Sequence, residues 1–257
     1  GSFQPLPFVV ALAAALLIQI GCNLANDYFD YHKGADTSAR LGPPRVTQSG
    51  LVPPATVWRA ALLVFALATL LGLYLVWVGG LPILLIGAAA IFAAVLYVGG
   101  PWPYGYHGLG DLVCFVFFGL LGVVGMALLL TGGAPPEAWW AALPVAALVT
   151  AILVVNNLRD IDTDRAARKY TLAVLLGQSG TRAEYVALLA LAYLVPPLWA
   201  LVGGPRWWWL PWLSLVLAAP TARLVLTAEG RPLNLALKQT ARLHLVYGAL
   251  WALALLL

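Results

Sequence analysis

Long and nearly uncharged apolar segments recur along the 257-residue chain, and each is about as long as a bilayer is thick. Hydrophobic residues make up 62% of the chain and charged residues only 9%, whereas a soluble domain carries about a quarter charged residues. A helix of about 20 apolar residues crosses the hydrocarbon core and satisfies its own backbone polar groups there. The sequence therefore predicts an integral membrane protein with an all-α fold, a polytopic bundle of transmembrane helices.

Glycines, prolines and polar residues divide the chain into eight predicted spans. They cover about Pro5–Tyr31, Pro53–Gly80, Leu81–Val98, Leu109–Leu130, Pro136–Asp164, Arg182–Val202, Trp207–Thr227 and Pro232–Leu257. A polar loop over His32–Val52 follows the first span, and a short apolar piece over Thr171–Leu176 precedes the sixth. We treat residues 1–257 as one integral-membrane domain.

Two matched stripes of Asn and Asp end the first and fifth spans. At helical steps of three and four residues, one Asn and two Asp share a helix face in each stripe. An ionised carboxylate near hydrocarbon needs a partner, so we predict that the bundle holds the stripes face to face around divalent cations. The equivalent places of the stripes indicate two four-helix pseudo-repeats around a central cavity. The stripes are Asn23, Asp27 and Asp30, and Asn156, Asp160 and Asp164.

The basic residues are unevenly distributed across the predicted membrane. Threading eight spans puts all but Arg206 of the 14 Lys and Arg residues on the side that carries both stripes. Positive residues favour the cytosolic side, so that side is predicted to face the cytosol. The net charge of +4 is thus a matter of topology, and no nucleic-acid partner is expected. Trp207–Trp209 would lie at the opposite interface, in an aromatic belt.

The chemistry of the stripes favours a diphosphate site. Carboxylate and amide oxygens are hard donors that suit Mg²⁺. Four carboxylates, two Mg²⁺ ions and a diphosphate with a charge of about −3 together have a net charge of about −3. Such an uncompensated charge is costly at low dielectric. Bases must therefore lie nearby, and the candidates are Lys33, Arg45, Arg159, Arg165 and Lys169. The substrate would be amphiphilic, with an allylic tail among the helices and aromatic side chains near the resulting cation.

An ion-coupled transporter is the alternative from another class. It explains carboxylates on membrane helices but not the basic residues that crowd the same loops. It also predicts acids at the middle of the bilayer, whereas these stripes lie at helix ends.

The motifs resemble those of the UbiA-type intramembrane aromatic prenyltransferases, and more strongly one branch, the 1,4-dihydroxy-2-naphthoate polyprenyltransferases of menaquinone biosynthesis. The resemblance covers residues 23–174. It rests on Asn26-Asp27-Tyr28-Phe29-Asp30-Tyr31-x-x-Gly34-x-Asp36, Arg45-x-Thr47-Gln48-Ser49-Gly50, Tyr97-x-Gly99-Gly100-Pro101, Tyr106-x-Gly108-Leu109-Gly110-Asp111, Asn156-Asn157-Leu158-Arg159-Asp160 with Asp164, and Thr171-Leu172-Ala173-Val174.

The resemblance implies Mg²⁺-dependent transfer of a polyprenyl group to an aromatic ring carbon, with release of diphosphate and CO2 and formation of demethylmenaquinone. It implies a bacterial cytoplasmic membrane, an active site on the cytosolic side, and polyprenyl diphosphate, an aromatic acceptor and membrane lipid as partners. Asp111 and Tyr97 would lie near the acceptor. The metal ligands would be Asp27, Asp30, Asp160 and Asp164 with Asn23 and Asn156. The diphosphate ligands would be Lys33, Arg45, Arg159 and Lys169, with secondary candidates Asn26, Asp36, Gln48, Tyr106, Asn157 and Arg165.

Other acceptors remain open within the same chemistry, namely 4-hydroxybenzoate, homogentisate, haem or chlorophyllide. The chain also departs from the family pattern. Nine helices are usual and eight are counted, so we expect the first to lie upstream of residue 1. The usual Gly-Lys-Arg reads Arg168-Lys169-Tyr170, and a usual Glu is Asp111.

Overall fold

The computed structural model describes residues 4–36 and 40–257, and most of these residues are helical. The helices are α1 (Pro5–His32), α2 (Pro54–Leu96), η1 (Tyr104–Tyr106), α3 (Gly110–Cys114), η2 (Phe115–Leu120), α4 (Leu121–Thr131), α5 (Pro136–Ala166), α6 (Leu172–Ala200), η3 (Leu210–Ser214), α7 (Leu215–Thr227) and α8 (Leu233–Leu256). The predicted all-α membrane fold class is confirmed. Residues 37–39 of the predicted polar loop and residues 1–3 lie outside the described residues.

Six helical segments of the described residues are long and apolar enough to cross a membrane: α1, α2, residues 110–131, α5, α6 and residues 210–227. The eight predicted spans differ from this set for two reasons. Residues 54–96 count once although Gly80, at φ 71°, divides them into two arms; 43 residues of straight helix would extend about 65 Å. The helix α8 begins with polar turns that carry Lys238 and Arg242.

Two predicted boundaries are wrong. The sixth helix, α6, spans Leu172–Ala200, but Gly177 at φ 70° divides it into a short arm, which is the predicted apolar piece, and a longer arm that begins before the predicted start at Arg182. The seventh begins after Trp207–Trp209, which form turns before η3. Local glycine geometry and tryptophan turns leave no periodic signal in the apolar pattern, which explains both errors.

The described chain forms two compact units. Unit 1 comprises residues 1–110, 124–134 and 163–171, and unit 2 comprises residues 111–123, 135–162 and 172–257. The predicted division into spans one to four and five to eight differs from these units in two segments. Residues 111–123 belong with the later helices, and residues 163–171 with the earlier ones.

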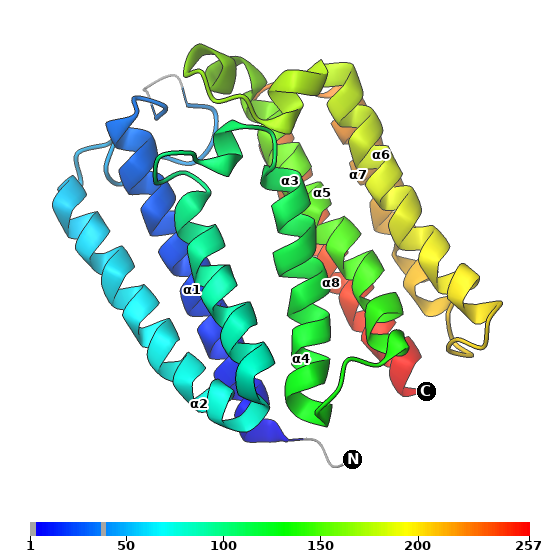
Figure 1. Ribbon diagram of the computed structural model, residues 1–257. Coiled ribbons are helices and arrows are strands. Elements are labelled where there is room, and N and C mark those ends of the chain that lie inside the picture. Colours follow the sequence, from blue (N-terminus) through cyan, green and yellow to red (C-terminus); the bar gives the residue numbers. More distant parts are fainter. Residues whose placement is uncertain (1–3, 37–39) are drawn as a thin grey trace. The chain divides into compact units, whose positions relative to one another are not determined.

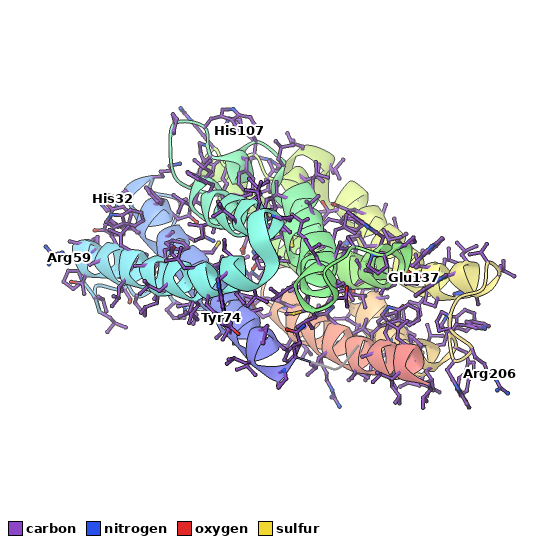
Figure 2. All side chains as sticks on the ribbon, turned by 60° about the horizontal axis from the view of Figure 1, so that its bottom comes forward. His32, Arg59, Tyr74, His107, Glu137 and Arg206 are labelled. Carbon is purple, nitrogen blue, oxygen red and sulfur yellow. The ribbon has the colours of Figure 1, made fainter. Side chains whose placement is uncertain are left out.

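In unit 1, α1 packs along α2, whose two arms form a hairpin (Figure 1). Gly21 makes this close packing possible, since a Cβ there would lie 2.6 Å from the Phe65 ring. Ala25, Ala61 and Ala94 are buried beside Phe65. The end of α1 at His32 and the start of α2 at Arg59 lie at the same end of this pair, which is where the first stripe is (Figure 2).

In unit 2, α5 is the most buried of the membrane-length helices and packs with α6, α7 and α8 around one apolar cluster. Polar side chains link these helices through backbone carbonyls. The Tyr247 hydroxyl donates to the Ala192 carbonyl at 2.5 Å, and Trp251 Nε1 donates to the Ala141 carbonyl at 3.1 Å. Glu137 and Arg206 mark the end of this unit opposite the second stripe (Figure 2).

The six-residue π-helical turn η2 brings Gly119 against α5. A Cβ at Gly119 would overlap the Cβ of Ala146, whereas a Cβ at Gly122, one turn on, would meet only the Phe117 carbonyl oxygen at 3.6 Å. Gly119→Ala should therefore lower thermal stability by about 1–3 kcal/mol through overpacking. Gly122→Ala is the control and should be neutral or slightly stabilising. Thermal unfolding in detergent tests the pair, and equal melting temperatures would contradict this packing.

Candidate active site

The end of α1 carries a buried carboxylate with two polar partners from distant loops of unit 1. Asp30 is 3% exposed. The Tyr106 hydroxyl donates to its Oδ1 at 2.7 Å, and Lys169 Nζ donates to its Oδ2 at 3.3 Å. Because hydrogen bonds to a charged group are the stronger ones, these two contacts offset part of the cost of burying the carboxylate.

Two ammonium groups flank the ring of Tyr106. Lys33 Nζ lies 4.4 Å and Lys169 Nζ 5.4 Å from the ring centroid, within the range of a cation–π interaction. Lys33 Nζ also donates to the Val98 carbonyl at 2.6 Å. Tyr106 thus brings both lysines to the same place.

The pKa values in this cluster reflect its charges. Burial lowers the pKa of Lys169, but attraction by Asp30 and Asp164 outweighs burial and raises it. Partial burial lowers the pKa of Lys33. Attraction to Asp30 opposes this shift, and repulsion by Lys169 adds to it. Burial raises the pKa of the Tyr106 hydroxyl, and the negative charge of the nearby Asp30 raises it further. One ammonium therefore interacts with a carboxylate from each stripe, Asp30 from the first and Asp164 from the second.

Two loops of unit 1 are joined behind this cluster. The Tyr170 backbone N–H donates to the Tyr106 carbonyl at 3.2 Å, and the Lys169 N–H donates to the Asp164 carbonyl at 2.8 Å. Arg168 adopts φ 57° to make this turn, a left-handed conformation that glycine adopts at lowest cost.

The loop that carries Tyr106 is fixed by a close approach to Tyr97. The Gly105 N–H donates to the Tyr97 carbonyl at 2.9 Å, and a Cβ at Gly105 would lie 2.6 Å from the Tyr97 ring. Tyr97 is half-buried, and its ring meets the Tyr104 ring edge-on with centroids 5.4 Å apart. The place of Tyr97 is thus set by the loop that positions Tyr106.

Two buried oxygens beside Asp30 have no hydrogen-bond donor among the residues that the structure describes. They are Oδ1 of Asp27, whose residue is 5% exposed, and Oδ1 of Asn26. A buried acceptor without a donor is costly, and a hard cation is the ligand that such oxygens suit. The donor set therefore fits Mg²⁺. Within either unit taken alone, the described residues contain no group of three or more His, Cys, Asp or Glu side chains that could hold a metal ion.

The loop after α1 holds a second acidic centre. Asp36 is buried, forms an ion pair with Arg40, and has its Oδ2 3.7 Å from Arg45 Nε. Burial raises the pKa of Asp36, and Arg40 and Arg45 partly oppose this shift. Gln48 is half-buried in the same loop.

In unit 2, the second stripe is bound to Arg159. The guanidinium donates from Nε to Asp160 Oδ1 at 2.8 Å and from Nη2 to Asp160 Oδ2 at 2.5 Å. Nη2 also donates to Asn156 Oδ1 at 2.9 Å, and Nη1 donates to Asn234 Oδ1 at 2.8 Å. The Arg159 side chain is 1% exposed.

Asp111 and Asn157 form another buried polar contact in unit 2. Asn157 Nδ2 donates to Asp111 Oδ1 at 3.5 Å, and both residues are 4% exposed. Asp111 lies in the first turn of its helix, where a carboxylate also benefits from the helix dipole.

The predicted residues therefore fall into separate groups. Unit 1 brings together Asp30, Lys33, Tyr106, Asp164 and Lys169, and unit 2 brings together Asn156, Arg159 and Asp160. Asn23 and Arg165 are exposed. Sequence reasoning missed Asn234, which lies in the C-terminal third outside every recognised motif. Its only signal is an amide in the first turn of an otherwise apolar helix.

Comparison with known proteins identifies the family. Residues 1–256 match the UbiA prenyltransferase family, and the chain belongs to that family. Its helical fold is shared with the apo structure of a UbiA homolog from Aeropyrum pernix, with a TM-score of 0.75 at 17% identity over 98% of this chain and 90% of that one.

Curated relatives of this integral membrane protein are prenyltransferases by name. It is 39% identical to a 1,4-dihydroxy-2-naphthoate octaprenyltransferase of Escherichia coli over 88% of this chain and 76% of that protein. It is also 39% identical to the 1,4-dihydroxy-2-naphthoate octaprenyltransferase of Mycobacterium tuberculosis, over 96% of this chain and 82% of that protein. It is 28% identical to human UbiA prenyltransferase domain-containing protein 1 over 100% and 75%.

Removing the Tyr106 hydroxyl tests whether it stabilises Asp30. Tyr106→Phe keeps the ring between the lysines but leaves Asp30 Oδ1 without that donor, so we expect a loss of about 1–3 kcal/mol in stability. Tyr104→Phe is the matched control, because the Tyr104 hydroxyl donates to a neutral carbonyl, that of Ala93, at 2.8 Å. Its loss should be about 1 kcal/mol. Thermal unfolding of both variants measures the difference, and a larger loss in the control would contradict the role of Tyr106.

Proposed function

We propose that this protein transfers a polyprenyl group from polyprenyl diphosphate to 1,4-dihydroxy-2-naphthoate, with loss of CO2 and diphosphate, as a step of menaquinone biosynthesis. The observation that carries the proposal is the contact of Lys169 with Asp30 and its attraction to Asp164. Acids and a base from both motifs thereby meet at the end of a membrane helix. The relatives named as 1,4-dihydroxy-2-naphthoate octaprenyltransferases support the choice of acceptor.

The lysines are the proposed ligands of the diphosphate. Lys33 and Lys169 present ammonium groups on one aromatic ring, and each ammonium has three N–H donors. Arg45 lies on the loop that follows α1, where Asp36 holds its Nε. A diphosphate at the helix end would leave the attached polyprenyl tail among apolar side chains.

The proposed reaction breaks the carbon–oxygen bond between the allylic carbon and the diphosphate, which leaves with the electron pair. A ring carbon of the acceptor supplies the pair that forms the new carbon–carbon bond. The carboxylate departs as CO2 and leaves its bonding pair in the ring. The prenyl group thus replaces the carboxylate, and no oxidant is needed for the transfer.

Mg²⁺ is the proposed cofactor. The charge balance of the motifs favours two ions, which would neutralise the departing diphosphate. The ligands would come from the two motifs: Asp27, Asp30, Asp160 and Asp164, with Asn23 and Asn156. The buried, unpartnered oxygens of Asn26 and Asp27 support this assignment.

Asp111 is the proposed residue at the acceptor end, and Tyr97 is the second residue that the motifs assign to the acceptor. Asn157 holds the Asp111 carboxylate by a hydrogen bond, so its direction in unit 2 is fixed. A fixed carboxylate can accept a proton from an acceptor hydroxyl and orient the ring for attack. The distribution of basic residues supports a bacterial cytoplasmic membrane with the site on the cytosolic side.

The acceptor and the reaction are tested together with the purified protein in lipid nanodiscs. The assay supplies Mg²⁺, octaprenyl diphosphate and 1,4-dihydroxy-2-naphthoate labelled in its carboxyl group. We expect labelled CO2 and a lipid-soluble prenylated quinol, which oxygen in air oxidises to the quinone, and EDTA should abolish formation of both products. Prenylation of 4-hydroxybenzoate or homogentisate, with the naphthoate unchanged, would overturn the acceptor. An absence of transfer to any of them would overturn the proposed function.

The role of Lys169 is tested separately from the chemistry. Lys169→Ala removes a charged donor, so the KM for the prenyl diphosphate should rise about 10- to 100-fold, with a smaller change in the KM for the naphthoate. Arg168→Gly is the matched control, because it removes the neighbouring exposed charge at a position whose φ of 57° suits glycine. An unchanged KM for the diphosphate in Lys169→Ala would exclude this role.

A further inference from the structure

The hairpin of α7 and α8 in unit 2 carries most of the excess positive charge of the chain. Residues 215–257 contain four basic side chains and one acidic side chain, a net charge of +3, whereas the whole chain has a net charge of +4. The proposed diphosphate site uses none of these bases. They are Arg223, Arg231, Lys238 and Arg242, and all four are exposed.

The turn between the two helices gathers this charge at one end of the hairpin. Helix α7 ends at Thr227, α8 begins at Leu233, and the two helices pack against each other. Arg223 lies about 6 Å before the end of α7, and Lys238 lies about 8 Å after the start of α8, at 1.5 Å per residue. Arg231 lies in the turn itself. The bases therefore lie at similar depths on neighbouring elements.

Helix α8 has a buried face and an exposed face. Tyr247 and Trp251 lie on the buried face and pack into the apolar cluster of unit 2. At steps of three and four residues, Lys238, Arg242 and Leu245 share the exposed face, and Leu245 is 72% exposed. This exposed stripe of α8 continues through Ala249, Leu253 and Leu256. It thus changes from charged to apolar along its length, as a helix does where it enters a membrane from the headgroup layer.

The charge of the stripe has no acidic partner on its own helix. Lys238 and Arg242 are one helical turn apart, where like charges repel, and α8 contains no Asp or Glu. Glu229, the acid of the hairpin, has its Oε1 3.7 Å from Arg182 Nη2 of α6. Within residues 4–36 and 40–257, none of the four bases of the hairpin forms an ion pair. An anion from outside the chain would remove the repulsion.

We propose that the exposed stripe of α8 binds an anionic phospholipid, with its phosphate at Lys238 and Arg242 and its acyl chains along the apolar residues that follow. Ammonium and guanidinium groups form charge-assisted hydrogen bonds with phosphate, and hydrocarbon chains match the exposed Leu245 and Leu256. A soluble anion would match only the charged part of the stripe. Arg223 and Arg231 add attraction for a negatively charged headgroup. The inference does not depend on the proposed reaction.

Titration of the full chain with lipid in detergent tests the site. The probes are dioleoylphosphatidylglycerol and dioleoylphosphatidylcholine, which share acyl chains and differ in net charge. Binding is measured as the rise in melting temperature on addition of lipid. Arg242→Gln removes one charge, and Lys238→Gln with Arg242→Gln removes both. Arg206→Gln is the matched single control, because it removes an exposed charge before the start of α7, at the other end of that helix.

We expect the wild type to reach half of its maximal thermal shift at an about 10- to 25-fold lower concentration of phosphatidylglycerol than of phosphatidylcholine, since each base near an anionic lipid contributes about fivefold. Arg242→Gln should reduce this preference about fivefold, and the double variant should abolish it. Arg242→Lys and Arg206→Gln should stay close to the wild type. Salt at about 0.5 M should weaken the preference of the wild type.

An undiminished preference for phosphatidylglycerol in the double variant would overturn the inference, as would an equal loss in Arg206→Gln. A thermal shift by inorganic phosphate that matches the lipid and is lost in the double variant would also overturn it, because the ligand would then be the free anion. If the double variant does not fold, Arg242→Gln and Arg242→Lys provide the comparison. The readout is lipid binding, so a failure here is distinct from an absence of prenyl transfer.

Discussion

The neutralisation of buried acidic groups at helix ends is the constraint on which the rest of the site depends. An isolated carboxylate in an apolar interior is costly, yet this chain buries Asp27, Asp30 and Asp160 near the ends of lipid-length helices. Each is treated differently. Asp30 has Tyr106 and Lys169 as donors, and Asp160 has Arg159. Asp27 has a buried oxygen for which the described part of the chain provides no donor. The chain therefore compensates Asp30 and Asp160 with its own donors, and the remaining acceptor of Asp27 supports the proposed cation.

The loops around the site follow from these needs. Lys169 reaches Asp30 because Arg168 accepts a left-handed backbone, and Tyr106 reaches it because its loop packs tightly on Tyr97 at Gly105. The site thus depends on strained or crowded backbone that ordinary helix packing would not require. Backbone strain of this kind is typically retained where function needs it.

The sequence predicted the fold and part of the site, and the features that it did not predict have definite physical reasons. Apolar length and the steps of three and four predicted the all-α fold and the face shared by Asp27 and Asp30, because both depend on local periodicity. The start of the longer arm of α6 could not be predicted from periodicity, since the left-handed backbone of Gly177 alone sets it. Nor could the partners of Arg159, because Asn234 is 75 residues away in sequence. Long-range hydrogen bonds of this kind leave no pattern in one sequence.

Binding of an unreactive substrate analogue tests the central claim most directly, since the claim concerns a cation-dependent diphosphate site rather than turnover. Titration calorimetry would follow a polyprenyl thiolodiphosphate added to the purified protein, with Mg²⁺ and with EDTA. The account predicts measurable binding with Mg²⁺ that falls at least about 10-fold in EDTA, the range expected when a charged ligand loses its counter-charge. Equal binding in Mg²⁺ and EDTA would contradict the account.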